Sequence, residues 1–231
     1  MFTNQEFGAR RFGSGAFMAT LQVLLGIFLW ILLRIFTKYE VYGGENLKNF
    51  KGPYIVAANH ESDFDPPLAG FTIFGANPSM LPLRYMAIDY LFYIPIFGQL
   101  IWMFGAFRTH RGKGIDRSLL VPRKILASGG GVIMFPEGHL VKERPKLGEG
   151  RRGAAVLALS TKAPIIPMSL HTPAKMTIFK FLFGRPHIVV RIGEPFYLDN
   201  TTYPDLSDEN TLAATKVIME KIGHLYYQHE Y

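Results

Sequence analysis

An uncharged apolar segment close to the N-terminus limits the folds open to this chain. It runs from Ala16 to Leu33, 18 residues without Asp, Glu, Lys or Arg. As a helix with a rise of about 1.5 Å per residue it would be about 27 Å long, close to the ~30 Å apolar core of a bilayer. We therefore expect a membrane-anchoring helix, whose length alone does not separate spanning from docking in one leaflet.

Basic residues flank this segment on both sides, which leaves its orientation open. Arg10 and Arg11 precede it, and Arg34 and Lys38 follow it. Symmetric flanks give no direction by the positive-inside rule. The arginine pair also hints at a cleavable twin-arginine export signal, but no small-x-small cleavage site follows Leu33. A retained anchor is favoured, with a signal peptide or a buried core helix as alternatives.

The rest of the chain alternates short apolar runs with helical patterns. Residues 54–58 (YIVAA) and 131–135 (GVIMF) are continuous apolar runs, typical of strands covered on both faces. Further strands are expected at 163–170 and 188–192, and helices at 152–161 and 209–227. This alternation indicates an α/β layer structure. We predict an N-terminal membrane-anchoring helical segment at residues 1–40 and one α/β domain at residues 41–231.

The apolar stretch 88–107 does not fit this alternation. Pro95 and Gly98 interrupt it, so a second full membrane span is not expected. One interpretation is core packing of two short helices. The other is an apolar surface that faces lipid or forms the wall of a groove for an acyl chain. Both interpretations can hold for different parts of the stretch.

Positive charge is concentrated in one part of the chain. The formal net charge is +7, and the stretch from Arg108 to Arg152 contains 11 Lys or Arg and 4 Asp or Glu, which accounts for the whole excess. Such a stretch indicates either an anionic partner, such as a phosphate, a coenzyme or a lipid headgroup, or a solvated basic face. No aromatic–basic repeat or recognition motif accompanies it, so no nucleic-acid partner is expected.

His60 and Asp65 form a His-x4-Asp pattern (NHESDFD) directly after the first predicted strand. A neutral imidazole can take a proton from a hydroxyl when a carboxylate holds its other nitrogen. The chain reverses at this strand-to-helix turn, so five residues can bring Asp65 under His60. Asp63 is the second choice for this partner. Asp65, which precedes two prolines, is also a good helix N-cap without any catalytic duty.

Glu137 and Gly138 follow the second predicted strand in the sequence VIMFPEGH. They lie at the carboxyl end of that strand, where α/β folds usually bind ligands. Glycine permits close backbone approach, and free N–H groups near it can meet an oxyanion or a phosphate. Two further segments stand out, GAFRTHR at residues 105–111 and the proline-flanked strand APIIP at residues 163–167.

These four segments, in this order, resemble the glycerolipid acyltransferase family typified by 1-acylglycerol-3-phosphate acyltransferases. The resemblance extends from about Tyr54 to Glu194. It implies a glycerol-phosphate acyltransferase-like α/β fold of one domain, with a mixed central sheet flanked by helices. The N-terminal apolar segment also looks like the membrane-docking helices of the family.

The resemblance implies roles for single residues as well. His60 matches the general base of the family, and Asp65 matches its carboxylate partner. Residues in or near the segments associated with glycerol-phosphate binding are expected to contact the substrate; they are Gly105, Phe107, Arg108, Arg111, Glu137, Gly138, Arg151 and Arg152.

One position departs from the family pattern. The family usually has Glu-Gly-Thr-Arg, whereas this chain has His139 and Leu140 after Glu137 and Gly138. The arginine expected to help hold the acceptor's phosphate is therefore absent. Either the acceptor is a lysolipid other than lysophosphatidic acid, or another cation replaces the arginine; the candidates are Arg108, Arg111, Lys142, Arg144, Arg151 and Arg152.

By this resemblance the chain is expected to be an O-acyltransferase of phospholipid biosynthesis. It would move an acyl group from acyl-CoA or acyl carrier protein to the sn-2 hydroxyl of 1-acylglycerol-3-phosphate, giving phosphatidic acid. The thioester is a co-substrate, and no bound cofactor is expected. The expected partners are membrane lipids, the acyl thioester donor and the lysolipid acceptor, and the site is expected on the cytoplasmic side of the membrane.

Other chemistries are less favoured by the sequence. The chain has no cysteine, which excludes a thiolate nucleophile and thiolate metal sites. Ser62 lies beside His60, but no Gly-x-Ser-x-Gly elbow surrounds it. No metal is expected, because no His-Glu-x-x-His or other familiar ligand spacing is present. A membrane lipid-binding protein that kept the fold and lost catalysis remains the non-enzymatic alternative.

Overall fold

The computed structural model describes residues 15–109, 114–141, 146–173 and 178–228. Its centre is a seven-stranded sheet in the order β1-β7-β6-β2-β5-β3-β4. All neighbouring strands in it are parallel except β6 and β7, which are antiparallel. The strands are β1 (Lys38–Tyr42), β2 (Tyr54–Ala58), β3 (Leu83–Ile88), β4 (Ala106–Thr109), β5 (Gly131–Met134), β6 (Ile165–His171) and β7 (His187–Ile192). The expected α/β fold with a mixed central sheet is confirmed.

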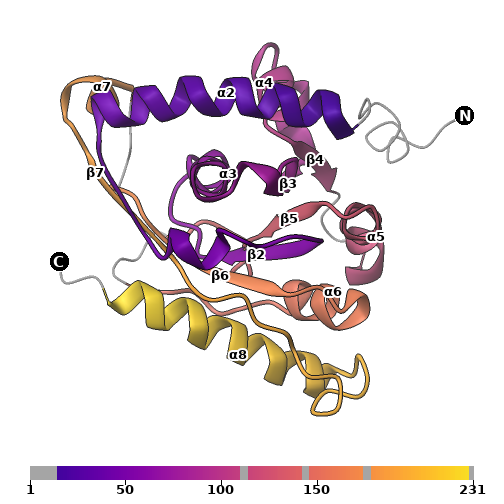
Figure 1. Cartoon of the computed structure of the whole chain (residues 1–231). Helices are drawn as coiled ribbons and strands as arrows, with labels where there is room; N and C mark the ends of the chain where they lie inside the picture. The colour runs from indigo at the N-terminus through magenta and orange to yellow at the C-terminus, as the bar shows by residue number, and fades with distance from the viewer. Residues whose placement is uncertain (1–14, 110–113, 142–145, 174–177, 229–231) are drawn as a thin grey trace, which may run out of the picture.

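Helices cover both faces of this sheet (Figure 1). One face carries α2 (Gly15–Phe36), α3 (Asp65–Ala76) and α4 (Phe97–Met103), and the other carries α5 (Ile115–Ala127), α6 (Gly153–Thr161) and α8 (Asp208–Tyr227). A short helix, α7 (Ile178–Phe183), follows β6 and precedes β7 in the chain. Three 3-10 turns are described, η1 (Gly44–Leu47), η2 (Pro78–Met80) and η3 (Asp89–Tyr93).

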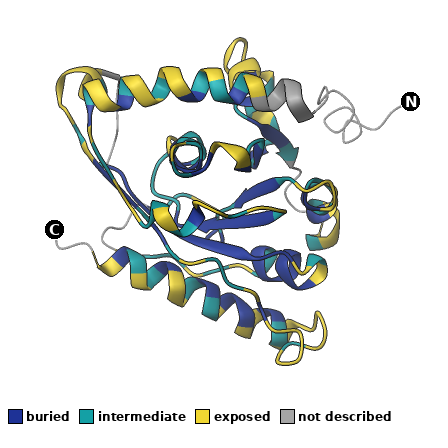
Figure 2. Ribbon diagram, in the orientation of Figure 1, coloured by how far each residue is buried: buried dark blue, intermediate teal, exposed yellow. Residues whose placement is uncertain are grey.

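The apolar runs in the sequence are the central strands of the sheet. Alternate residues of β2 point to opposite layers, Val56 to the layer under α2 and α3, and Ile55 to the layer under α6 and α8. Figure 2 shows the central strands almost entirely buried. Both faces of these strands are covered, so no polar alternation appears in them. The six elements predicted by residue range agree with the structure within two residues at either end.

Helix α2 has its apolar side turned outward. The side chains that face the protein include Gln22 and Leu33, whereas Leu24, Phe28 and Ile31 are exposed. The helix packs on α3 and leads into β1, which pairs with β7. The predicted boundary at residue 40, between an anchoring segment and the α/β domain, stays a prediction.

No helix in the part of the chain described by the structure is both long and apolar enough to cross a membrane.

The stretch 88–107 packs partly in the core, as the first interpretation predicts, whereas contact with lipid or an acyl chain stays a prediction. It forms η3, α4 and the first half of β4. Ile101 is buried in the core and Phe104 lines a small cavity, while Tyr93 and Ile96 are exposed to solvent. One part of the stretch is therefore a cavity wall, and another part is an apolar surface.

Candidate active site

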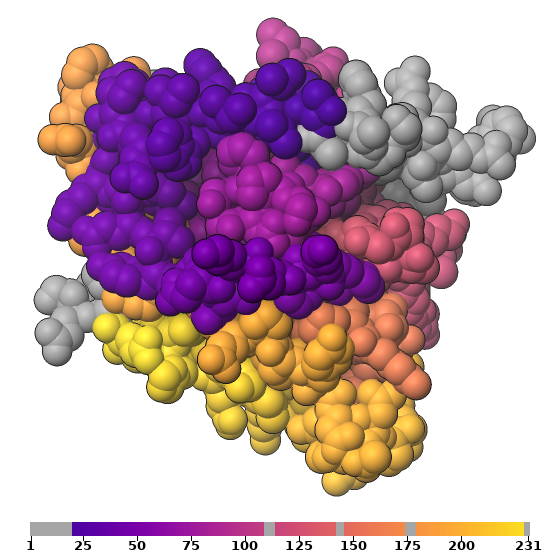
Figure 3. Space-filling view, viewed as in Figure 1, coloured from indigo at the N-terminus to yellow at the C-terminus, as the bar shows by residue number. Residues whose placement is uncertain are grey.

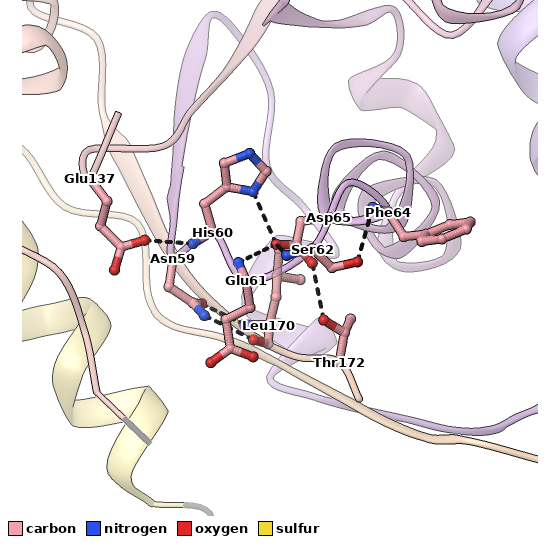
Figure 4. Close-up of polar contacts among 9 residues, drawn as sticks. All are labelled: Asn59, His60, Glu61, Ser62, Phe64, Asp65, Glu137, Leu170 and Thr172. Atoms are coloured by element: carbon pink, nitrogen blue, oxygen red, sulfur yellow. Dashed lines mark hydrogen bonds and ion pairs between the residues drawn. The ribbon is translucent and has the colours of Figure 1, made fainter. Parts of the chain in front are cut away.

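His60 and Asp65 meet at the carboxyl end of β2, near the middle of the sheet. His60 is the second residue after the strand, and Asp65 is the first residue of α3. The His60 Nδ1 atom lies 3.1 Å from the Asp65 Oδ2 atom. Figure 4 shows the other ring nitrogen pointing away from Asp65. The chain reversal expected from the spacing therefore brings the pair together, with one imidazole nitrogen left to act on a substrate.

The Asp65 carboxylate is fully buried and held by several donors. Its Oδ2 atom also accepts the N–H groups of Glu61 at 2.6 Å and Ser62 at 2.7 Å. Its Oδ1 atom accepts the Thr172 hydroxyl at 3.4 Å. The prediction that Asp65 is a helix N-cap is wrong: Phe64 holds that position, and Asp65 instead accepts N–H groups that precede it. Such fixed contacts keep the carboxylate oriented toward the imidazole.

Two other residues of the NHESDFD segment do not take the place of this pair. Asp63 is exposed to solvent. The Ser62 hydroxyl accepts a hydrogen bond from the Phe64 N–H at 3.2 Å. Asp65 is therefore the carboxylate partner of His60 in this structure.

The turn after β5 packs directly against His60. The Phe135 ring stacks on the imidazole, with 4.2 Å between ring centroids. The His60 N–H donates to Glu137 Oε2 at 2.7 Å, and the His60 carbonyl accepts the Val141 N–H at 2.8 Å. The His60 side chain keeps 18% of its surface exposed, enough to meet a ligand from one side.

Glu137 is a buried connector between two backbone segments. Its Oε2 atom accepts the His60 N–H, and its Oε1 atom accepts the Gly148 N–H at 2.7 Å. Burial raises the pKa of this carboxyl, while these two N–H groups act in the opposite direction. Both oxygens are engaged with backbone N–H groups, and a substrate contact of Glu137 stays a prediction.

Asn59 is a site residue that the sequence reasoning missed. It is fully buried, and its side-chain amide pairs with the backbone of Leu170 on β6 at 2.9 and 2.7 Å. This pairing fixes the end of β2 directly before His60. A polar residue that ends a continuous apolar strand was the available signal.

The arginines expected to bind substrate occupy different places. Arg108 donates to the Tyr93 hydroxyl at 3.2 Å and lies over the rings of Phe92 and Tyr93. Arg152 forms an ion pair with Asp208 at the start of α8. Arg111, like Lys142 and Arg144, lies outside the described residues.

Arg151 lies against the turn that carries Glu137. Its N–H donates to the Pro136 carbonyl at 2.7 Å. Gly138 has a φ of 69°, and a Cβ atom there would stand 2.8 Å from the Arg151 Cδ atom. Glycine thus lets the Arg151 side chain cross the turn. Arg151 is exposed and forms no ion pair within the described ranges.

Gly105 and Phe107 serve packing in this structure. Gly105 has a φ of 96°, and a Cβ atom there would meet the Leu83 carbonyl at 2.4 Å. Phe107 is 3% exposed and belongs to the core layer under α5, α6 and α8. Their expected contact with the substrate stays a prediction.

A small apolar cavity lies along α3, and its lining starts at the two residues that directly follow Asp65. It is bounded by α2, α3, β3 and β5. Pro66 and Pro67 line it directly after Asp65, and Phe74 and Phe104 line it farther away. Gln22, on the inward side of α2, donates to the carbonyls of Leu83 and Phe104 beside this cavity.

No group of three His, Asp or Glu side chains suited to a metal ion occurs in the described part of the chain. The arrangement offers general-base chemistry instead. An oriented imidazole, whose carboxylate partner directly precedes two residues that line an apolar cavity, suits an apolar substrate with a reactive hydroxyl or carbonyl group.

Comparison with known proteins decides the family. The sequence model of the Acyltransferase family matches residues 38–171, which cover the sheet from β1 to β6 and the His60–Asp65 pair. This chain belongs to the acyltransferase family. It is an enzyme, an O-acyltransferase.

Named relatives point to the glycerolipid branch of this acyltransferase family. The chain is 29% identical over 198 residues to the 1-acyl-sn-glycerol-3-phosphate acyltransferase of Bacillus subtilis, covering 85% of this chain and 92% of that protein. It is 26% identical to the chloroplastic 1-acyl-sn-glycerol-3-phosphate acyltransferase BAT2 of Brassica napus, covering 73% of this chain and 48% of that protein.

A solved structure has the same fold as this acyltransferase. The crystal structure of the 1-acyl-sn-glycerophosphate acyltransferase PlsC from Thermotoga maritima matches 92% of this chain and 81% of its own, with a TM-score of 0.62. The two sequences are 20% identical, so this likeness supports the fold alone.

Proposed function

We propose that this acyltransferase moves an acyl group from a thioester donor to the sn-2 hydroxyl of 1-acylglycerol-3-phosphate, giving phosphatidic acid. The main support for this proposal is the 3.1 Å contact between His60 Nδ1 and the buried Asp65 carboxylate. It leaves the other imidazole nitrogen as a base. The Bacillus subtilis and Brassica napus relatives are 1-acyl-sn-glycerol-3-phosphate acyltransferases, which supports this choice of acceptor.

The reaction is a direct transfer in which His60 moves one proton. His60 Nε2 takes the proton of the acceptor hydroxyl as that oxygen attacks the thioester carbonyl carbon. The buried Asp65 carboxylate stabilises the imidazolium that forms. The tetrahedral intermediate then collapses, the carbon–sulfur bond breaks, and the imidazolium gives its proton to the leaving thiolate. No acyl-enzyme is needed.

The oxyanion of the intermediate needs donors that are not already engaged. The N–H groups of His60, Glu61 and Ser62 bind Glu137 or Asp65. In the turn after β5, the N–H groups of His139 and Leu140 form no hydrogen bond among the described residues. These two groups are the best placed donors for an oxyanion beside His60.

The apolar cavity is suited to an acyl chain. Its lining begins at Pro66 and Pro67, one and two residues after the catalytic carboxylate, and is formed mostly by apolar side chains. Pro66 and Pro67 directly follow Asp65, so part of an acyl chain that entered this cavity would extend along α3 from the end that carries Asp65. This assigns the cavity wall near Phe104 to substrate binding.

The outward side of α2 is suited to a lipid surface. Most of its exposed residues are apolar, including Leu24, Phe28 and Ile31, while the polar residue Gln22 faces the protein. A helix in water would show the opposite arrangement. We propose that α2 lies in one leaflet, where its cavity side can receive chains from the bilayer.

The test is acyl transfer by purified, detergent-solubilised protein from a long-chain acyl-CoA to a panel of lysolipids. We expect lysophosphatidic acid to be acylated, His60→Ala to be inactive, and His187→Ala, an exposed histidine on β7, to be active. Activity only with another lysolipid would contradict the acceptor. Inactivity with acyl-CoA and with acyl carrier protein would favour a lipid-binding role.

A further inference from the structure

Helix α7 shows an apolar surface that packing within the protein does not explain. One side of the helix packs inward through Phe181, whose ring lies 5.9 Å from that of Phe36 at the end of α2. The other side exposes Phe179 and Phe183, at 72% and 73% of their surface, together with Leu182. These two phenylalanines pack against each other, with 5.0 Å between ring centroids, and together indicate an apolar surface that is covered in use.

This apolar surface continues that of α2. Figure 1 shows α7 beside the C-terminal end of α2, and the two helices are in contact. The space-filling view places the segment around α7 next to the surface formed by the end of α2 (Figure 3). α2 is roughly 33 Å long at 1.5 Å per residue, so a lipid contact at α7 would support the helix at one end.

The charges around both helices favour an anionic bilayer as the covering partner. Residues 15–36 and 172–187 contain no Asp or Glu. Arg34 lies over the Trp30 ring at 5.2 Å, a pairing of cation and aromatic ring that suits the boundary of a bilayer. Lys180 and Arg185 add positive charge on and directly after α7. Such cations attract anionic headgroups while the rings enter the apolar layer.

We infer that α7 is a second membrane-contact element, in which Phe179 and Phe183 enter the same leaflet as α2 and Lys180 contacts anionic headgroups. The inference rests on the proposed membrane function of α2. Two contacts, one along α2 and one at its end, fix how α2, which bounds the cavity, lies on the bilayer. The cavity that Gln22 of α2 lines is then held at a fixed level relative to the leaflet.

A single-cysteine experiment tests this contact directly, because the chain has no cysteine of its own. Phe183→Cys on α7, Phe28→Cys on α2 and Tyr197→Cys, between β7 and α8, are each labelled with an environment-sensitive fluorophore. All three positions are exposed, so no core residue is disturbed. The labelled proteins are mixed with vesicles of phosphatidylglycerol and phosphatidylethanolamine, and iodide is added as an aqueous quencher.

We expect the labels at 28 and 183 to shift to shorter wavelength and become shielded from iodide, and the label at 197 to stay accessible. In addition, the double variant Phe179→Ser/Phe183→Ser should have a vesicle affinity about tenfold or more below that of the wild type, since two large apolar contacts are lost. A shielded label at 28 with an accessible label at 183 overturns the inference and leaves α2 as the contact. Accessible labels at both positions overturn both contacts. The proposed chemistry is tested separately, by acyl transfer to a short-chain acceptor that is dissolved as monomers.

Discussion

The Tyr226 hydroxyl donates a hydrogen bond to the Glu61 carboxylate and so joins the last turn of α8 to the residue that follows His60. Tyr226 is fully buried, with its ring stacked on His171 at 4.4 Å. The Glu61 N–H in turn donates to Asp65. The C-terminal helix therefore helps to hold the loop that orients the catalytic carboxylate.

Tyr226→Phe should lower kcat about three- to tenfold and leave KM for both substrates nearly unchanged, because one hydrogen bond to a charged group is lost and no substrate contact is changed. Steady-state kinetics measure this separation. Tyr227→Phe, its exposed neighbour, is the matched control and should behave as wild type. An unchanged kcat in Tyr226→Phe would mean that the contact with Glu61 serves packing alone.

Asp65→Asn should lower kcat by about 10²- to 10⁴-fold, the usual range for losing an oriented base. Asp65 Oδ2 accepts from Glu61 N–H and Ser62 N–H and contacts His60 Nδ1. An asparagine amide cannot replace the charge that stabilises the imidazolium. Single-turnover acyl transfer measures the effect, with the exposed Asp63→Asn as control. Similar rates in the two variants would remove Asp65 from the mechanism.

The sequence predicted the elements that depend on local pattern. Continuous apolar runs marked β2 and β5, and the short spacing between His60 and Asp65 was enough to bring the two side chains together across one turn. The polar residue Gln22 within the N-terminal apolar segment also signalled an inward-facing position, although this signal was not used.

Contacts between distant segments could not be predicted in the same way. Asn59 pairs with Leu170, which is 111 residues away, and Tyr226 reaches Glu61 across 165 residues. Such pairs depend on strand order and helix position, which no local pattern specifies. For the same reason the sequence did not predict that the N–H groups of His60 and Gly148 both donate to Glu137.

Glu137→Gln should change how stability depends on pH. Burial raises the pKa of Glu137, so the folded protein binds this proton more tightly than the unfolded chain. The stabilisation is complete below the ordinary glutamate pKa and is lost as pH rises through the raised value. Glutamine has no such proton, so the Tm of wild type minus that of the variant should be larger at about pH 4 than at about pH 7. The reverse order would show that the two N–H donors outweigh burial.

Arg151 is the described arginine best placed to replace the one missing at Leu140. It crosses Gly138 without an ion pair, whereas Arg152 binds Asp208 and Arg108 binds Tyr93. Arg151→Ala should raise KM for lysophosphatidic acid about 10- to 100-fold, as expected for a charge-assisted contact with phosphate. It should change kcat little, because the reacting groups are untouched. Acyl transfer at varied acceptor concentration measures both constants.

Restoring the arginine at the other position tests whether the two guanidinium groups serve one phosphate. Leu140→Arg added to Arg151→Ala should return KM toward the wild-type value, since residue 140 belongs to the same turn beside His60. Arg152→Ala, which breaks only the exposed pair with Asp208, is the matched control and should keep the wild-type KM. If Arg151→Ala leaves KM unchanged, the phosphate is held elsewhere. If KM rises and Leu140→Arg does not lower it, Arg151 binds the acceptor from a position that residue 140 cannot reach.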